Sequence, residues 1–135
     1  MNKLVAVAAF DDELVKGVEV TYSPNGTHKF RCTIRQGGAA NNEYAAALEE
    51  EFRPYRQSGI EPNDIAVAEQ RAIIARCLAK HIIIGWNETD FEAPFSVGLC
   101  TDTLIKVPGW ATFIANQSGK ENLFRKKSIE DASGN

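Results

Sequence analysis

The residues in this sequence best suited to chemistry are a cysteine and a histidine four positions apart, Cys77 and His81. On a helix this spacing places both side chains on one face, where a thiolate–imidazole pair or two metal ligands could form. A zinc site needs further ligands, yet His28 is the only other histidine, and Cys32 and Cys100 offer no paired spacing. We therefore interpret Cys77 as a buried packing residue beside a partly exposed histidine, and we expect no metal and no cofactor.

Two runs of carboxylates, at 11–13 and 49–51, could serve hydrolysis or bind a hard cation. Adjacent residues on a helix point in different directions, so neither run converges on one ion. The glycines after Gln36 precede a helix but lack the lysine and the spacing of a phosphate-binding loop. The sequence contains no nucleophile elbow, metalloprotease motif or dinucleotide-binding fingerprint. We therefore expect no catalytic residue and a protein that is not an enzyme.

Composition and charge limit the class of protein. The 135 residues fit one domain, and 44% hydrophobic with 24% charged residues is ordinary for a globular chain. A net charge of −3 argues against a nucleic-acid-binding module. The apolar run at 4–10 is too short to span a membrane, and acidic residues follow it at once, unlike a secretory signal. We expect a cytoplasmic protein with reduced cysteines that binds neither nucleic acid nor membrane.

Two short segments have the alternation of a β-hairpin. Residues 18–22 alternate apolar and polar side chains, and residues 30–34 do so again. Between them, Ser23-Pro24-Asn25-Gly26 favours a turn, because proline fixes its own φ and Asn-Gly tolerates positive φ. The pattern predicts an antiparallel β-hairpin, which needs a helix or further strands to cover its apolar face.

A helix is predicted after the hairpin, starting at Asn41 or Asn42, either of which can accept a hydrogen bond from the first turn. Pro54 has no N–H to donate, so we expect it to kink or end this helix. The apolar face recurs at three- and four-residue steps through Tyr44, Ala47, Leu48, Phe52 and Tyr55.

The longest predicted element is a central helix over about 64–84. Asn63 or Asp64 can cap its start, and Gly85 stands where a left-handed residue would close it. Roughly 20 residues would make this helix about 30 Å long. Its apolar stripe includes Ile73, and we expect it to organise the core.

The last third of the chain is rich in aromatic residues. Pro94-Phe95-Ser96 fits a helix start, and Pro108 fits the first position of another helix that ends at Gly119. Both core packing and a binding surface explain such residues, because interfaces are enriched in tryptophan and phenylalanine. Trp110 and Phe113, one helical turn apart, are the candidate partner-binding residues. The aromatic residues of this region are Trp86, Phe91, Phe95, Trp110 and Phe113.

Together these elements predict a small single-domain α+β fold over residues 1–127, with a β-hairpin packed on three to five helices. Residues 128–135 lack apolar periodicity and are expected to form a disordered C-terminal tail. Residues 4–15 fit either a strand or a short helix, of which the helix is favoured. Residues 97–107 are open between a short helix capped by Ser96 and irregular structure.

Three stretches of the sequence, together with the order of the predicted elements, carry a family resemblance. The first is Val18–Tyr22 with Phe30-Arg31-Cys32, and the second is Asn41–Tyr44 running into Phe52–Arg56. The third is Ile82–Trp86, followed by an acidic loop and Pro94-Phe95-Ser96. Over residues 15–125 this order resembles the tail assembly chaperones of long-tailed bacteriophages. Family members often carry a recognisable apolar helix after the Pro-Phe-Ser position, where this chain has the weak helix former Val97-Gly98-Leu99-Cys100-Thr101.

The resemblance implies a chaperone that coats the long, aggregation-prone tape measure protein until the tail tube polymerises around it. It also implies a homo-oligomer in the bacterial host cytoplasm, absent from the mature virion, with the tail tube protein as a second candidate partner. The alternative is a structural adaptor or tail-completion protein that stays in the virion. Mass spectrometry of purified virions separates the two, because only the adaptor would be found there.

Overall fold

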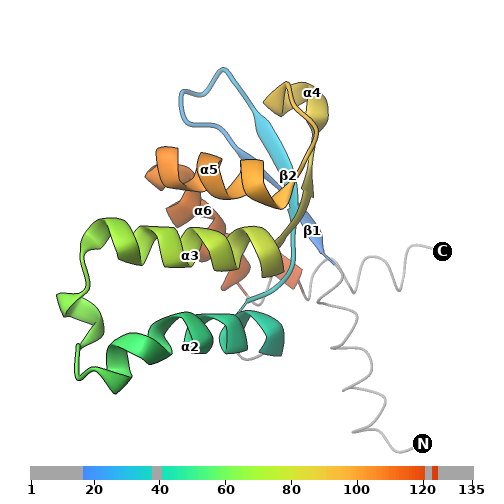
Figure 1. Ribbon diagram of the computed structural model, residues 1–135. Coiled ribbons are helices and arrows are strands. Elements are labelled where there is room, and N and C mark those ends of the chain that lie inside the picture. Colours follow the sequence, from blue (N-terminus) through green and yellow to red (C-terminus); the bar gives the residue numbers. More distant parts are fainter. Residues whose placement is uncertain (1–16, 38–40, 121–122, 125–135) are drawn as a thin grey trace, which may run out of the picture.

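The computed structural model describes residues 17–37, 41–120 and 123–124 (Figure 1). Three strands, β1 (Val18–Tyr22), β2 (Phe30–Ile34) and β3 (Ile83–Trp86), form an antiparallel sheet in the order β1-β2-β3. In the described part of the chain they are accompanied by a short 3₁₀ helix, η3 (Pro62–Asp64), and five α-helices. These are α2 (Asn42–Gln57), α3 (Val67–His81), α4 (Glu88–Phe91), α5 (Val97–Lys106) and α6 (Pro108–Ser118). The predicted small α+β fold, a hairpin packed on helices, is confirmed.

The predicted hairpin is present with β1 and β2 in full register, from Val18 opposite Ile34 to Tyr22 opposite Phe30. The turn is held by Asn25, whose Oδ1 accepts hydrogen bonds from the backbone N–H groups of residues 27 and 28 at 3.0 and 2.8 Å. The next residue, Gly26, has a φ of 74°, which a residue without a Cβ adopts at no steric cost. The turn predicted from the sequence therefore fixes which residues of β1 and β2 lie opposite each other.

The predicted central helix is shorter than 64–84. It runs over Val67–His81, while Ile83–Trp86 forms the third strand, with Ile83 opposite Ile34. Gly85 lies within this strand and does not close a helix. The run of isoleucines at 82–84 continues the helical apolar pattern, but β-branched residues fit equally well beside a hydrophobic strand. Pairing with β2 makes residues 83–86 a strand and not the end of the helix.

The helix predicted after the hairpin is α2, and Asn41 is its N-cap, with Oδ1 accepting from the N–H of Tyr44 at 3.0 Å. Pro54 lies in the last turn, where its missing N–H costs one hydrogen bond, and the helix ends three residues later at Gln57. Although the predicted apolar face turns toward α3, none of the 16 residues of α2 is fully buried.

The segment left open at 97–107 is mostly helical. Ser96 caps α5 by accepting from the N–H of Leu99 at 3.1 Å, as the capping pattern allows. The hydroxyls of Thr101 and Thr103 donate to carbonyls four residues earlier, so these poor helix formers keep their polar groups satisfied. Pro108 begins α6, as predicted.

The core lies between one face of the sheet and the helices α3, α5 and α6, and Figure 1 shows α3 between α2 and α5. Ile73 is 1% exposed, in agreement with the predicted inward face of the central helix.

No helix in the described ranges is long and apolar enough to cross a membrane. The predictions for residues 4–15 and 128–135 lie outside the described residues.

Candidate functional site

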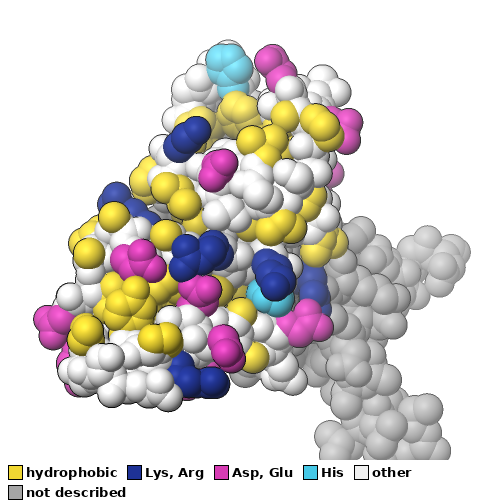
Figure 2. Space-filling view, in the orientation of Figure 1, with side chains coloured by type: hydrophobic (Ala, Val, Ile, Leu, Met, Phe, Trp, Pro, Cys, Tyr) yellow, Lys and Arg dark blue, Asp and Glu magenta, His cyan; other side chains and the backbone are white. Residues whose placement is uncertain are grey.

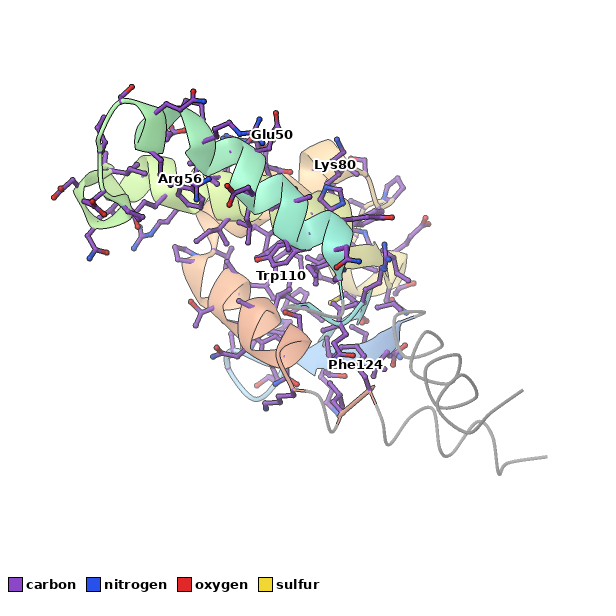
Figure 3. The ribbon with its side chains drawn as sticks, turned by 90° about the horizontal axis from the view of Figure 1, so that it is seen from below. Glu50, Arg56, Lys80, Trp110 and Phe124 are labelled. Carbon is purple, nitrogen blue, oxygen red and sulfur yellow. The ribbon has the colours of Figure 1, made fainter. Side chains whose placement is uncertain are left out.

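The two candidate partner-binding residues lie on α6 and are not freely exposed. Trp110 is only 2% exposed and belongs to the hydrophobic core, and Figure 3 shows it projecting toward the middle of the molecule. Phe113 is partly buried and packs against Tyr22 with ring centroids 5.1 Å apart. Trp110 also lines the pocket described below.

Trp110 belongs to a cluster of aromatic rings that come from β2, β3, α4, α6 and the segment before α5. Trp86 of β3 stacks on Phe91 of α4 with centroids 4.2 Å apart and an interplanar angle of 6°. Phe91 also contacts Trp110 at 5.4 Å and Phe30 of β2 at 5.4 Å. Phe95 meets the edge of Trp86 at 5.3 Å. Four of the five aromatic residues noted in the last third of the sequence therefore meet in one cluster, which Phe30 of the hairpin joins.

Four rings of the cluster, those of Phe30, Trp86, Phe91 and Trp110, line a pocket of about 400 Å³, which we call the aromatic pocket. Apart from the tyrosine phenol, its lining contains no ionisable side chain. The lining residues are Tyr22, Pro24, Phe30, Trp86, Phe91, Ala93, Leu99, Thr103, Val107 and Trp110. A pocket of this size and character is typical of a binding site for an apolar group.

A clamp between β2 and α4 holds one wall of the pocket in place. The guanidinium of Arg31 donates to both carboxylate oxygens of Asp90, at 2.8 and 3.0 Å, and the Arg31 backbone N–H donates to Asp90 at 3.0 Å. These hydrogen bonds hold the pKa of Asp90 below its ordinary value, and the same contact raises the pKa of Arg31. Two residues 59 positions apart are thereby joined beside the aromatic cluster.

Two further hydrogen bonds order the loop that follows β3. The side chain of Asn87 caps α4 by accepting from the N–H of Asp90 at 2.9 Å. The indole N–H of Trp86 donates to the carbonyl of Ala93 at 2.9 Å. The loop therefore presents its rings in one arrangement, which reduces the entropy lost when the pocket is filled.

The mouth of the aromatic pocket has an exposed apolar rim on α5 and just beyond it. Leu99, Thr103 and Val107 follow one another at four-residue steps, and Leu99 and Val107 are 40% and 42% exposed. The hairpin contributes Tyr22, Pro24 and Phe30 to the lining of the pocket. Figure 2 shows hydrophobic side chains gathered over α5 and toward the hairpin.

The cysteines are not poised for chemistry. All three are buried, and burial raises the pKa of Cys32 and of Cys100 to about 12 and that of Cys77 above its ordinary value. Each thiol therefore stays protonated at neutral pH and is a poor nucleophile or metal ligand. His81 lies with its Nδ1 3.9 Å from a carboxylate oxygen of Glu43, beside a polar hollow between α2 and α3.

The acidic run at 49–51 diverges, as helical geometry predicts. Each carboxylate pairs with a different arginine: Glu49 with Arg56, Glu50 with Arg53 and Glu51 with Arg76. Within the described ranges no group of three or more histidine, cysteine, aspartate or glutamate residues could hold a metal ion. The run at 11–13 lies outside those ranges.

A family model described as YdaY prophage protein matches residues 39–135. The chain belongs to this prophage protein family. The bacteriophage origin implied by the resemblance is therefore confirmed, while the more specific role of tail assembly chaperone is not addressed by the match. No curated protein and no solved structure matches the chain.

The matched span includes the part of the prophage protein that carries most of the aromatic pocket. All of the pocket residues from β3 to α6 lie within residues 39–135, whereas Tyr22, Pro24 and Phe30 precede the span. The lining offers hydrophobic contact and ring stacking. The arrangement is therefore suited to recognition.

Proposed function

We propose that this prophage protein is a non-enzymatic tail assembly chaperone that binds the tape measure protein and keeps it soluble while the tail tube assembles. The observation that carries the proposal is the aromatic pocket, which opens beside an exposed apolar rim on α5. Burial of apolar surface is the main driving force for such binding. The resemblance to tail assembly chaperones and the membership of a prophage family support the same conclusion.

The shape of the rim suits an amphipathic helix. Leu99 and Val107 are eight residues apart, so the rim is about 12 Å long at the helical rise per residue. Two turns of a partner helix are about 11 Å long, and its apolar residues at i, i+4 and i+7 would lie along this length. A tape measure helix would place one anchor in the pocket and its neighbours along the rim.

Each copy of the chaperone would supply a small contact, so the proposal requires many copies on one long ligand. Linked sites raise overall affinity without any new contact. Further exposed apolar side chains lie outside the pocket and could join copies into the proposed homo-oligomer: Ile60, Ile74, Ile84, Val97 and Ile105. Paired arginine and glutamate side chains on α2 and α3 make the surface of these helices hydrophilic.

The test is co-expression with the tape measure protein encoded in the same prophage. Leu99→Asp places a carboxylate on the rim, in the first turn of α5, where the helix tolerates negative charge. We expect the soluble fraction of tape measure protein to fall well below that obtained with the wild-type chaperone.

The matched control is Val67→Asp, which makes the same kind of change at the first turn of α3, on a residue that is 62% exposed. We expect this variant to solubilise as the wild type does. Equal solubilisation by Leu99→Asp and the wild type would contradict the proposed surface. Absence of any solubilisation by the wild type, together with the protein's presence in purified virions, would favour an adaptor.

A further inference from the structure

The strand β1 lies at an edge of the sheet, so one of its two sides has no neighbouring strand in the described part of the chain. Edge strands present unpaired backbone N–H and C=O groups, which can pair with another extended chain. Many proteins block such an edge with a lysine, a proline or a bulge. The strand β1 contains no lysine or proline, and its register with β2 is regular. Its free side is therefore open to a further strand.

The hydrogen bonds of β2 show which backbone groups of β1 face outward. The C=O of Arg31 accepts from the N–H of Asn87 at 2.9 Å, on the β3 side of β2. The N–H of Arg35 donates on the same side, to the C=O of Ile82 at 2.8 Å. Alternate residues of an antiparallel strand direct their backbone groups to opposite sides. The odd-numbered residues of β2 therefore bond toward β3, and the even-numbered residues bond toward β1.

Two residues of β1 direct their backbone groups away from the sheet. Val18, Val20 and Tyr22 lie opposite even-numbered residues of β2 and bond to them. Glu19 and Thr21 lie opposite odd-numbered residues, so the N–H and C=O of each point to the free side. Among the residues that the structure describes, none is a hydrogen-bond partner of these groups. Both side chains are exposed as well.

The free side of β1 is complementary to a second copy of itself. If two copies run antiparallel about Val20, Glu19 of one copy lies opposite Thr21 of the other. Each such pair exchanges two hydrogen bonds, so all the outward groups of both strands are satisfied. No like charges lie directly opposite each other, and the Thr21 hydroxyl can donate to the Glu19 carboxylate across the pair. The two Val20 side chains meet on the side of the sheet that faces the core.

We propose that the β1 strands of two copies pair antiparallel about Val20 and join the two three-stranded sheets into one. The pairing is a property of this chain and does not depend on the tape measure protein. A contact along one short strand is small, so the dimer is weak and its population rises with concentration. Copies bound side by side on one long ligand would have the high local concentration that such a contact needs.

The experiment uses the purified full chain without any ligand. Analytical ultracentrifugation from about 10 µM to about 1 mM covers the range of a weak dimer. Amide hydrogen exchange followed by NMR then locates the contact. We expect the exchange of the Glu19 and Thr21 amides to slow as the concentration rises, while the Val20 amide, already bonded to β2, serves as internal control. A chain that stays monomeric, or dimerises without slowing these two amides, would overturn the proposal.

Thr21→Pro removes an outward N–H and no hydrogen bond to β2, and proline is tolerated on an edge strand. Two hydrogen bonds are lost from the dimer, so we expect its dissociation constant to rise about 30-fold. The matched control is Thr21→Val, which keeps the N–H and the branched Cβ and should dimerise nearly as the wild type does. Unchanged dimerisation of Thr21→Pro would refute the pairing, and the wild-type amide exchange decides the question if this variant fails to fold.

Discussion

Adjacent isoleucines on α3 give a matched test of where the core lies. Ile73 is 1% exposed and Ile74 is 36% exposed, and both are within the same helix. Replacement by alanine removes the same atoms at both positions and gives the same small gain in helix propensity. At Ile73 the change also leaves a cavity, so we expect a loss of about 3 kcal/mol, within the range for buried isoleucine.

At Ile74 much of the side chain already meets solvent, so the expected loss is below about 1 kcal/mol. For a domain of this size, these losses of stability correspond to a melting temperature lowered by about 10 °C in Ile73→Ala and by a few degrees at most in Ile74→Ala. Urea denaturation gives the free energies, and thermal melting followed by circular dichroism gives the temperatures. Equal losses at the two positions would refute the burial of the face of α3 that carries Ile73.

Two further predictions concern charge and thiol chemistry. The hydrogen bonds from Arg31 lower the pKa of Asp90 from its ordinary value of 3.8. The ionised Asp90 side chain should therefore stabilise the fold fully above pH 3.8, compared with Asp90→Asn. This difference in stability should shrink as the pH falls through the lowered pKa. Stability curves of wild type and variant that stay parallel down to pH 2 would contradict this. Cys77→Ala and His81→Ala should each retain solubilising activity, with a modest packing loss at Cys77 only. Stoichiometric zinc in the purified protein, lost in either variant, would show that the pair is a metal site.

The parts of the fold that depend on neighbouring residues were predictable from the sequence. The Asn25-Gly26 turn and the Asn41 and Ser96 caps each use a side chain and backbone groups within three residues. The third strand was not predictable in this way. Its isoleucines, next to the helix end, extend the helical pattern, and only β2, about 50 residues earlier, makes them a strand.

The candidate site was predictable only in part, for the same physical reason. Periodicity marked Trp110 as apolar but could not show that the hairpin and the α4 loop cover it. The hairpin residues of the aromatic pocket approach it through tertiary contacts alone. One local signal existed, because the Asn87 cap indicates a tight turn that brings Phe91 back onto Trp86.

Because α2 is only partly buried, the free energy needed to open the backbone locally differs between parts of the domain. A helix with no fully buried residue is fixed mainly by a half-covered face and by ion pairs such as Glu51–Arg76, which contribute little in water. We therefore expect its amide protons to exchange with solvent through local opening, and those of α3 near the buried Leu78 to exchange only when the whole domain unfolds. Such an opening would expose the surface of α3 beneath α2 while the aromatic pocket, which contains no residue of α2, stays intact.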